Sequence, residues 1–167
     1  GADAEIAKYP AAAVRGFKLF AGKGACTLCH LGPLLTSGEF GDIGISQFTG
    51  VGAVDKGRYE GIQILRESPF NLLGIYNDDP KAARGLRTRH VKLQHRNFGE
   101  FRIPSLRNVS KTAPYMHNGS VQTLMDVVGF YSELDEERLH SDGEKILRPL
   151  NLSGGEKADL VAFLKTL

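Results

Sequence analysis

The chain has 167 residues, of which 41% are hydrophobic, so its length and composition suit one folded domain over residues 1–167. Lysine and arginine number 21 against 19 aspartate and glutamate, and the formal net charge of +2 does not by itself indicate a polyanionic partner. No apolar segment is long enough to form a transmembrane helix, which excludes a membrane span.

The first predicted helix runs over Pro10–Phe20, where Ala13 and Phe17 recur at helical spacing. Pro10 suits the first turn of this helix. Gly16 lies in the helix interior, where glycine costs about 1 kcal/mol relative to alanine. This placement indicates that another helix approaches closely at Gly16.

Directly after this helix comes Cys26-Thr27-Leu28-Cys29-His30, which contains both cysteines of the chain. A Cys-x-x-Cys-His run is typical of covalent c-type haem attachment. Cys26 and Cys29 would form thioethers with the porphyrin, and His30 would ligate the iron. The alternatives are a redox cysteine pair, a structural disulfide and half of a zinc site. A redox pair would require a βαβ context and a zinc site a second paired cluster, so the run favours one covalent haem c.

The middle of the chain has weaker patterns. Residues 31–49 are rich in glycine and predict a loop, and residues 57–67 predict a short helix ended by Ser68-Pro69. Residues 77–80 predict a turn. Ile103–Val109 predicts another short helix, because proline near its start suits a first turn.

A basic segment lies between residues 81 and 111, where Glu100 is the single acidic residue. Its cations are Lys81, Arg84, Arg87, Arg89, Lys92, Arg96, Arg102, Arg107 and Lys111. The functional interpretations are pairing with haem propionates and docking of an acidic protein partner, and the structural alternative is a solvated loop. Nucleic-acid binding is disfavoured, because neither a binding motif nor interleaved aromatic residues accompany the charge.

Residues 123–133 predict a helix with Thr123 as its N-cap. Tyr131 lies on the apolar face of this helix, which points to the core or the haem. Met125 lies about 110° from the middle of that face, which favours a flank position.

The acidic residues 133–144 predict a surface connection, and the final helix follows it. Ser153 and Glu156 form a capping box before an apolar stripe that ends at Leu167.

The second iron ligand would separate an electron carrier from a catalyst. Methionine raises the potential of a haem, histidine and tyrosinate lower it, and an open position admits peroxide. The candidate side chains are Met116, Met125, Tyr131, His90, His95, His117 and His140. Spacing alone does not choose among them.

Four stretches resemble the carboxy-terminal haem domain of the bacterial dihaem cytochrome c peroxidase and MauG family. They are Gly16–Phe20, Phe101–Val109, Thr112–Ser120 and Leu152–Leu167. The match covers most of the chain and is weakest from about residue 43 to residue 97. The resemblance implies an all-α, cytochrome c-like haem domain with long loops.

The resemblance also implies site residues. Tyr131 matches the position where the peroxidases have a distal methionine and MauG-type members have a tyrosine ligand, and Met116 ranks second as the distal ligand. Arg107 is expected, from its charge and position, to hold a haem propionate. Family peroxidases bind calcium partly through carbonyls that match Thr112 and Pro114, but the other half of that site belongs to a domain absent from this sequence.

Family peroxidase chemistry uses two haems, whereas this sequence has one Cys-x-x-Cys-His run. We therefore expect a monohaem c-type cytochrome that transfers electrons to a redox protein partner. A peroxidase or oxidase-type domain acting beside a second haem, and a haem-based sensor, are the alternatives. Because this kind of haem attachment follows export, the chain is expected to be periplasmic or otherwise extracytoplasmic, although its first residues do not form a signal peptide.

Overall fold

The fold is described from a computed structural model, which describes residues 8–79, 81, 83–138, 142 and 146–167. These residues gather into two compact units. Unit 1 comprises the described residues of Gly1–Glu39, Arg102–Arg138 and Lys145–Leu167, and unit 2 those of Phe40–Phe101 and Leu139–Glu144. The single domain expected from the sequence stays a prediction.

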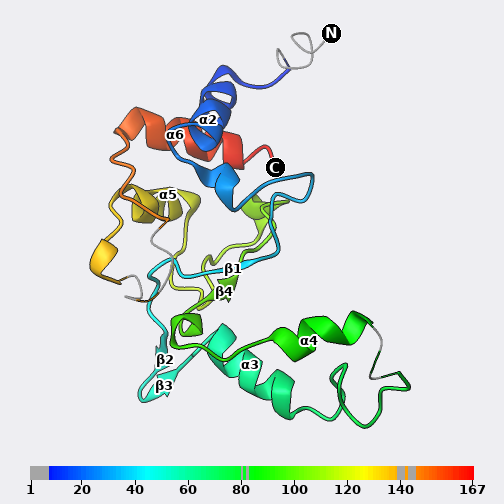
Figure 1. Cartoon of the computed structure of the whole chain (residues 1–167). Helices are drawn as coiled ribbons and strands as arrows, with labels where there is room; N and C mark the ends of the chain where they lie inside the picture. The colour runs from blue at the N-terminus through cyan, green and yellow to red at the C-terminus, as the bar shows by residue number, and fades with distance from the viewer. Residues whose placement is uncertain (1–7, 80, 82, 139–141, 143–145) are drawn as a thin grey trace. The chain divides into compact units, whose positions relative to one another are not determined.

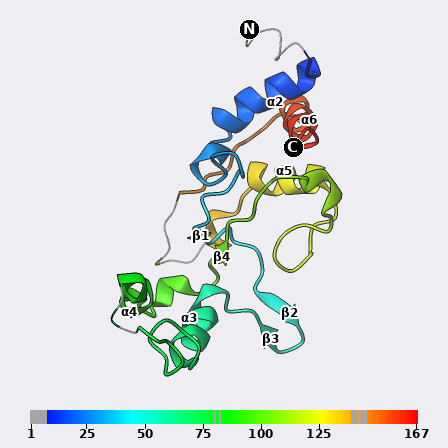
Figure 2. The ribbon, with the colours of Figure 1, turned by 90° about the vertical axis from the view of Figure 1, so that its right-hand side faces the viewer.

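Unit 1 is built around three helices: α2 (Ala11–Ala21), α5 (Leu124–Ser132) and α6 (Gly154–Leu164). Helices α2 and α6 lie side by side in Figure 1 and again in Figure 2. Their apolar faces meet those of α5 in one core of buried side chains. This core contains Phe20, Leu124, Val128, Leu152, Leu160, Val161 and Leu164.

The close approach expected at Gly16 is confirmed. A Cβ atom built on Gly16 would overlap the Asp159 carbonyl of α6 and would lie 2.8 Å from the Phe163 Cβ. Glycine therefore lets the two helix backbones approach more closely than any larger residue would allow.

Both predicted helix caps are confirmed. The Thr123 side chain accepts a hydrogen bond from the Asp126 N–H at the start of α5. Ser153 and Glu156 form the reciprocal capping box of α6. These contacts satisfy backbone donors that the first helical turn leaves without intrahelical partners.

Unit 2 contains α3 (Arg58–Glu67) and α4 (Leu86–His90), together with the antiparallel pair β2 (Phe48–Gly50) and β3 (Ala53–Val54). Helix α3 matches the prediction for residues 57–67, whereas α4 was not predicted. The short strands β1 (Phe40–Gly41) and β4 (Phe101–Arg102) lie at the unit boundaries in the chain.

The helical class expected from the sequence agrees in part with the structure. The described residues form five α-helices and four strands of two or three residues each. In the part of the chain that the structure describes, no helix is long and apolar enough to cross a membrane.

The helix predicted over Ile103–Val109 is wrong. Residues 103–106 have no regular secondary structure, and Asn108 has a left-handed backbone with φ 58°. The Ile103 N–H donates instead to the Glu39 carbonyl at 2.9 Å. Contacts with distant loop residues therefore replace the local helical hydrogen bonds that the proline pattern predicted.

Candidate functional site

The two cysteines lie on a single turn that follows α2. This turn is the 3₁₀-helix η1 (Cys26–Leu28), which begins after Ala25 in a left-handed conformation with φ 49°. The Cys26 carbonyl accepts hydrogen bonds from the backbone N–H groups of Cys29, at 3.2 Å, and His30, at 2.8 Å. The turn thus brings both thiols and the imidazole together on a few residues of backbone.

Both cysteines are free and partly buried. Cys26 packs against the core cluster of unit 1, and its thiol donates to the Gly24 carbonyl at 3.4 Å. Burial raises the pKa of Cys26 to about 11 and also raises the pKa of Cys29. Both side chains are therefore neutral thiols at neutral pH.

His30 is tied to the loop that follows it. Its Nδ1 atom lies 3.0 Å from the Leu35 carbonyl. Burial lowers the pKa of His30, while hydrogen bonds of its ring to the backbone carbonyls of Leu35 and Pro104 act in the opposite direction. Because a carbonyl only accepts, we assign the Nδ1 proton to this contact, which leaves Nε2 for a ligand bond.

Tyr131 lies on α5 and is half-buried. Burial raises the pKa of Tyr131, and charge interactions with Cys26 and Cys29 add to this effect. The Tyr131 ring also meets the Phe130 ring edge-on, with centroids 5.5 Å apart. The structure therefore brings together three of the residues that the sequence singled out, and the iron-ligand role of Tyr131 stays a prediction.

The two methionines differ in exposure. Met116 is half-buried and has a left-handed backbone with φ 68°. Met125 is 43% exposed, which agrees with the flank position expected for it. The role of Met116 as the second-ranked distal ligand stays a prediction.

The remaining candidate histidines are on the surface or outside the described residues. His90 and His95 belong to unit 2 and are exposed, and His117 in unit 1 is exposed as well. His140 lies outside the described residues.

Arg107 contacts the loop after the cysteine turn. Its Nε atom donates to the Pro33 carbonyl at 2.8 Å. The sequence pattern did not indicate this contact, because the two residues are 74 positions apart. The propionate contact expected for Arg107 stays a prediction.

The residues fit a covalently bound haem. Two free thiols lie on one turn with His30, whose Nδ1 is bonded and whose Nε2 is left for a metal. A hollow of about 410 Å³ in the same unit is lined by Thr36 and residues 102–105, and neither His30 nor the two cysteines line it. A helical unit built around such a turn is the arrangement of a c-type cytochrome domain.

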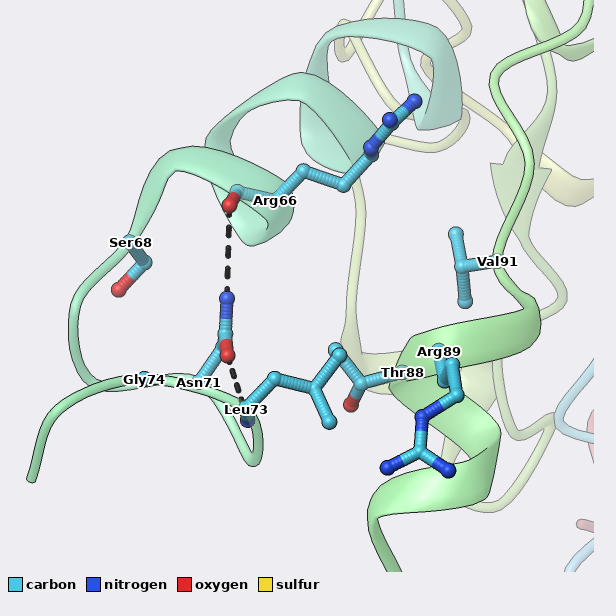
Figure 3. A pocket seen from close by; sticks show the side chains of 8 residues that line it. All are labelled: Arg66, Ser68, Asn71, Leu73, Gly74, Thr88, Arg89 and Val91. Atoms are coloured by element: carbon cyan, nitrogen blue, oxygen red, sulfur yellow. Dashed lines mark hydrogen bonds between the residues drawn. The ribbon is translucent and has the colours of Figure 1, made fainter. Parts of the chain in front are cut away.

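A second hollow, of about 330 Å³, lies in unit 2 between the end of α3, residues 68–74 and α4. Figure 3 shows its two arginines, Arg66 and Arg89, with guanidinium groups that point away from each other. The cationic groups therefore do not converge on a common ligand position.

Comparisons with known proteins support the resemblance seen in the sequence. No family model matches the chain. The chain is 37% identical over 159 residues to cytochrome-c peroxidase IdrP1 of Pseudomonas sp. (strain SCT), which covers 92% of this chain and 39% of that protein. It is 31% identical over 155 residues to methylamine utilization protein MauG of Methylorubrum extorquens, covering 93% of this chain and 34% of that one.

A solved structure agrees with these relatives. The crystal structure of a MauG-like protein associated with microbial copper homeostasis superposes with a TM-score of 0.62 and 27% identity, covering 95% of this chain and 44% of that one. The resemblance is therefore confirmed: over most of its length the chain is a homologue of the cytochrome c peroxidases and MauG. The chain spans about two fifths of the length of the first curated relatives that it matches.

Proposed function

We propose that the chain binds one haem c covalently and works in extracytoplasmic electron transfer. The observation that carries this proposal is the turn of Cys26, Cys29 and His30, with both thiols free and the imidazole tied through Nδ1. When bound, the haem supplies one-electron redox chemistry of its iron.

The chain's own residues have distinct roles in this proposal. Cys26 and Cys29 would hold the haem through thioethers, and His30 would offer its Nε2 atom to the iron. Tyr131 would be the second protein ligand of the iron, a role supported by its charge interactions with both thiols. The apolar core of α2, α5 and α6 excludes water from one side of the turn.

A catalytic alternative has support from the comparisons. Several relatives are named cytochrome-c peroxidases, and the chain covers only about two fifths of their length. In this alternative the chain acts beside a second haem in a peroxidase-type reaction. An open distal position on the iron would favour it over the electron carrier.

The proposed partner is an acidic redox protein that docks on unit 2. We define the docking surface as the exposed apolar side chains of Phe70, Leu73, Ile75 and Tyr76, of which Phe70 is 77% and Ile75 83% exposed. The Phe70 and Tyr76 rings stack with centroids 4.9 Å apart. Large exposed apolar patches often mark protein interaction sites.

The charge beside the docking surface supports an acidic partner. Leu73 lines the same hollow as Arg66 and Arg89. Further exposed cations of unit 2 are Lys81, Arg84, Arg87, Lys92 and Arg96. Positive charge in the same unit as an apolar surface steers an acidic protein toward it and repels a second basic copy.

Absorbance and low-temperature electron paramagnetic resonance spectra of the ferric protein test the proposal. We expect a covalently attached haem with a low-spin signal that becomes high-spin in Tyr131→Phe and stays low-spin in the matched variant Met116→Leu. The reverse pattern would move the distal ligand to Met116. A high-spin signal in the unsubstituted protein would favour the catalytic alternative, and absence of covalent haem would sink the proposal.

A further inference from the structure

Leu35, whose carbonyl contacts His30 Nδ1, has an unfavourable backbone conformation. Leu35 has φ 51°, in the left-handed region that non-glycine residues seldom adopt. Such a conformation persists where the surrounding structure holds it. The local turn contributes two contacts, from the Leu35 N–H to the Gly32 carbonyl at 3.0 Å and from the Thr36 N–H to the Leu31 carbonyl at 3.1 Å.

Three side-chain hydrogen bonds hold the residues on either side of Leu35. The Ser105 hydroxyl donates to the Leu34 carbonyl at 2.6 Å, and Arg107 Nε donates to the Pro33 carbonyl at 2.8 Å. The Thr36 hydroxyl donates to the Ile103 carbonyl at 2.6 Å. All three join the loop after the cysteine turn to residues 103–107, so the residues that flank Leu35 on both sides are attached to one segment.

Residues 103–107 are themselves attached to the rest of unit 1. The Ile103 N–H donates to the Glu39 carbonyl, and the Asn108 N–H donates to the Leu167 carbonyl, each at 2.9 Å. Leu106 packs against the core cluster. The segment is therefore a fixed support for the loop.

We propose that Thr36, Ser105 and Arg107 are positioning residues that hold the Leu35 carbonyl against His30 Nδ1. This inference rests on the proposed function, in which His30 ligates a haem iron. A fixed N–H···O contact sets the ring orientation and tautomer and makes the imidazole a stronger electron donor. A stronger donor stabilises ferric iron, so the three contacts lower the reduction potential.

Substitutions that remove a hydroxyl without changing charge test this inference in the haem-loaded protein. Thr36→Val and Ser105→Ala each delete one donor, and Thr36→Ser keeps it. Arg107→Gln removes the Pro33 contact together with one charge, so Lys111→Gln, an exposed position of the same unit, serves as the charge control. The measurements are amide hydrogen exchange of residues 35–38 and the haem reduction potential.

We expect loop amides to exchange about three- to tenfold faster in Thr36→Val, Ser105→Ala and Arg107→Gln, as loss of one hydrogen bond implies. The reduction potential should rise in Thr36→Val and Ser105→Ala and stay unchanged in Thr36→Ser. Because loss of a cation by itself lowers the potential, Arg107→Gln should have a higher potential than the charge control Lys111→Gln.

Three results would overturn the inference. Unchanged loop exchange would show that these contacts do not hold the loop. Faster exchange with an unchanged potential would show that they stabilise the loop without positioning His30. A protein without covalent haem would overturn the proposed function and this inference together, whereas a low-spin haem protein with unresponsive variants would overturn the inference alone.

Discussion

At the scale of single residues, glycine decides how closely the two main helices of unit 1 approach. Gly16 on α2 faces the Asp159 carbonyl of α6, where a Cβ atom would overlap it. The Phe163 ring packs beside this point against both Phe17 and Phe20, with centroids 5.4 and 5.1 Å away. A side chain added at Gly16 would therefore displace both the backbone of α6 and the aromatic rings packed beside it.

We expect Gly16→Ala to lower the free energy of unfolding by about 3 kcal/mol, since it forces the helices apart in a packed region. Urea unfolding, followed by circular dichroism, measures this loss. Gly61→Ala in α3 is the matched control, because a Cβ at Gly61 meets nothing within 4 Å. That control should be neutral or stabilising by up to about 1 kcal/mol. Equal stabilities for the two variants would contradict close packing at Gly16.

At the scale of elements, ion pairs link α6 to its neighbours. Arg15 on α2 donates to both carboxylate oxygens of Asp159 on α6, each at 2.7 Å. Lys157 on α6 pairs with Glu133 at the end of α5 at 2.6 Å. Hydrogen bonding to Arg15 lowers the pKa of Asp159, and hydrogen bonding to Lys157 lowers that of Glu133.

These pKa shifts predict weaker helix pairing in acid. A carboxyl group with a lower pKa in the folded than in the unfolded state stabilises the fold above its unfolded pKa. That stabilisation disappears as the pH falls through the folded pKa. We therefore expect the melting temperature to decrease less steeply below about pH 4 in Asp159→Asn than in the unsubstituted protein.

Melting curves recorded at a series of pH values below neutrality compare Asp159→Asn with the unsubstituted protein. Glu137→Gln, which removes an exposed carboxylate away from the α2 and α6 pair, should follow the unsubstituted protein. Identical acid profiles for Asp159→Asn and the unsubstituted protein would contradict a contribution from this pair.

At the scale of the whole molecule, the proposed haem site and the proposed docking surface lie in different compact units. Unit 1 contains the cysteine turn, His30 and Tyr131, whereas unit 2 contains the docking surface and most of the basic segment. The docking surface is part of an ordered loop: Asn71 Nδ2 donates to the Leu65 carbonyl at 2.8 Å, and the Leu73 N–H donates to Asn71 Oδ1 at 2.7 Å. Its apolar side chains are thus exposed by a defined backbone.

We expect a double substitution, Phe70→Ser with Ile75→Ser, to change the free energy of unfolding by less than about 0.5 kcal/mol, because both side chains are exposed. The same change should at least halve the binding of anilinonaphthalene sulfonate, an apolar anionic dye, in equilibrium dialysis. Added salt should weaken the dye binding of the unsubstituted protein, since Arg66 and Arg89 line the same hollow as Leu73.

Phe20→Ser provides the contrast, because Phe20 is 2% exposed and its loss should cost about 3 to 5 kcal/mol. A large stability loss in the double variant would show that Phe70 and Ile75 belong to a core. Unchanged dye binding would contradict the docking surface.

Two features that depend on neighbouring residues, the N-terminal caps of α5 and α6, were predicted correctly. The caps at Thr123 and Ser153 form as expected, because each joins a side chain to a backbone group three positions away. The prediction for Ile103–Val109 failed for the opposite reason, since contacts with Glu39 and with the loop after the cysteine turn outweigh a weak local preference.

The sequence by itself determined which residues can carry the chemistry of the site, namely the Cys-x-x-Cys-His run and a tyrosine on the apolar face of its helix. It also determined the close approach of two helices at Gly16. The tertiary structure alone decided which groups surround that chemistry. The Leu34 and Pro33 carbonyls meet donors 71 and 74 positions away, and Asp159 meets Arg15 across 144 positions. No local periodicity encodes such pairs, because packing of the whole unit sets which distant backbone and charged groups face each other.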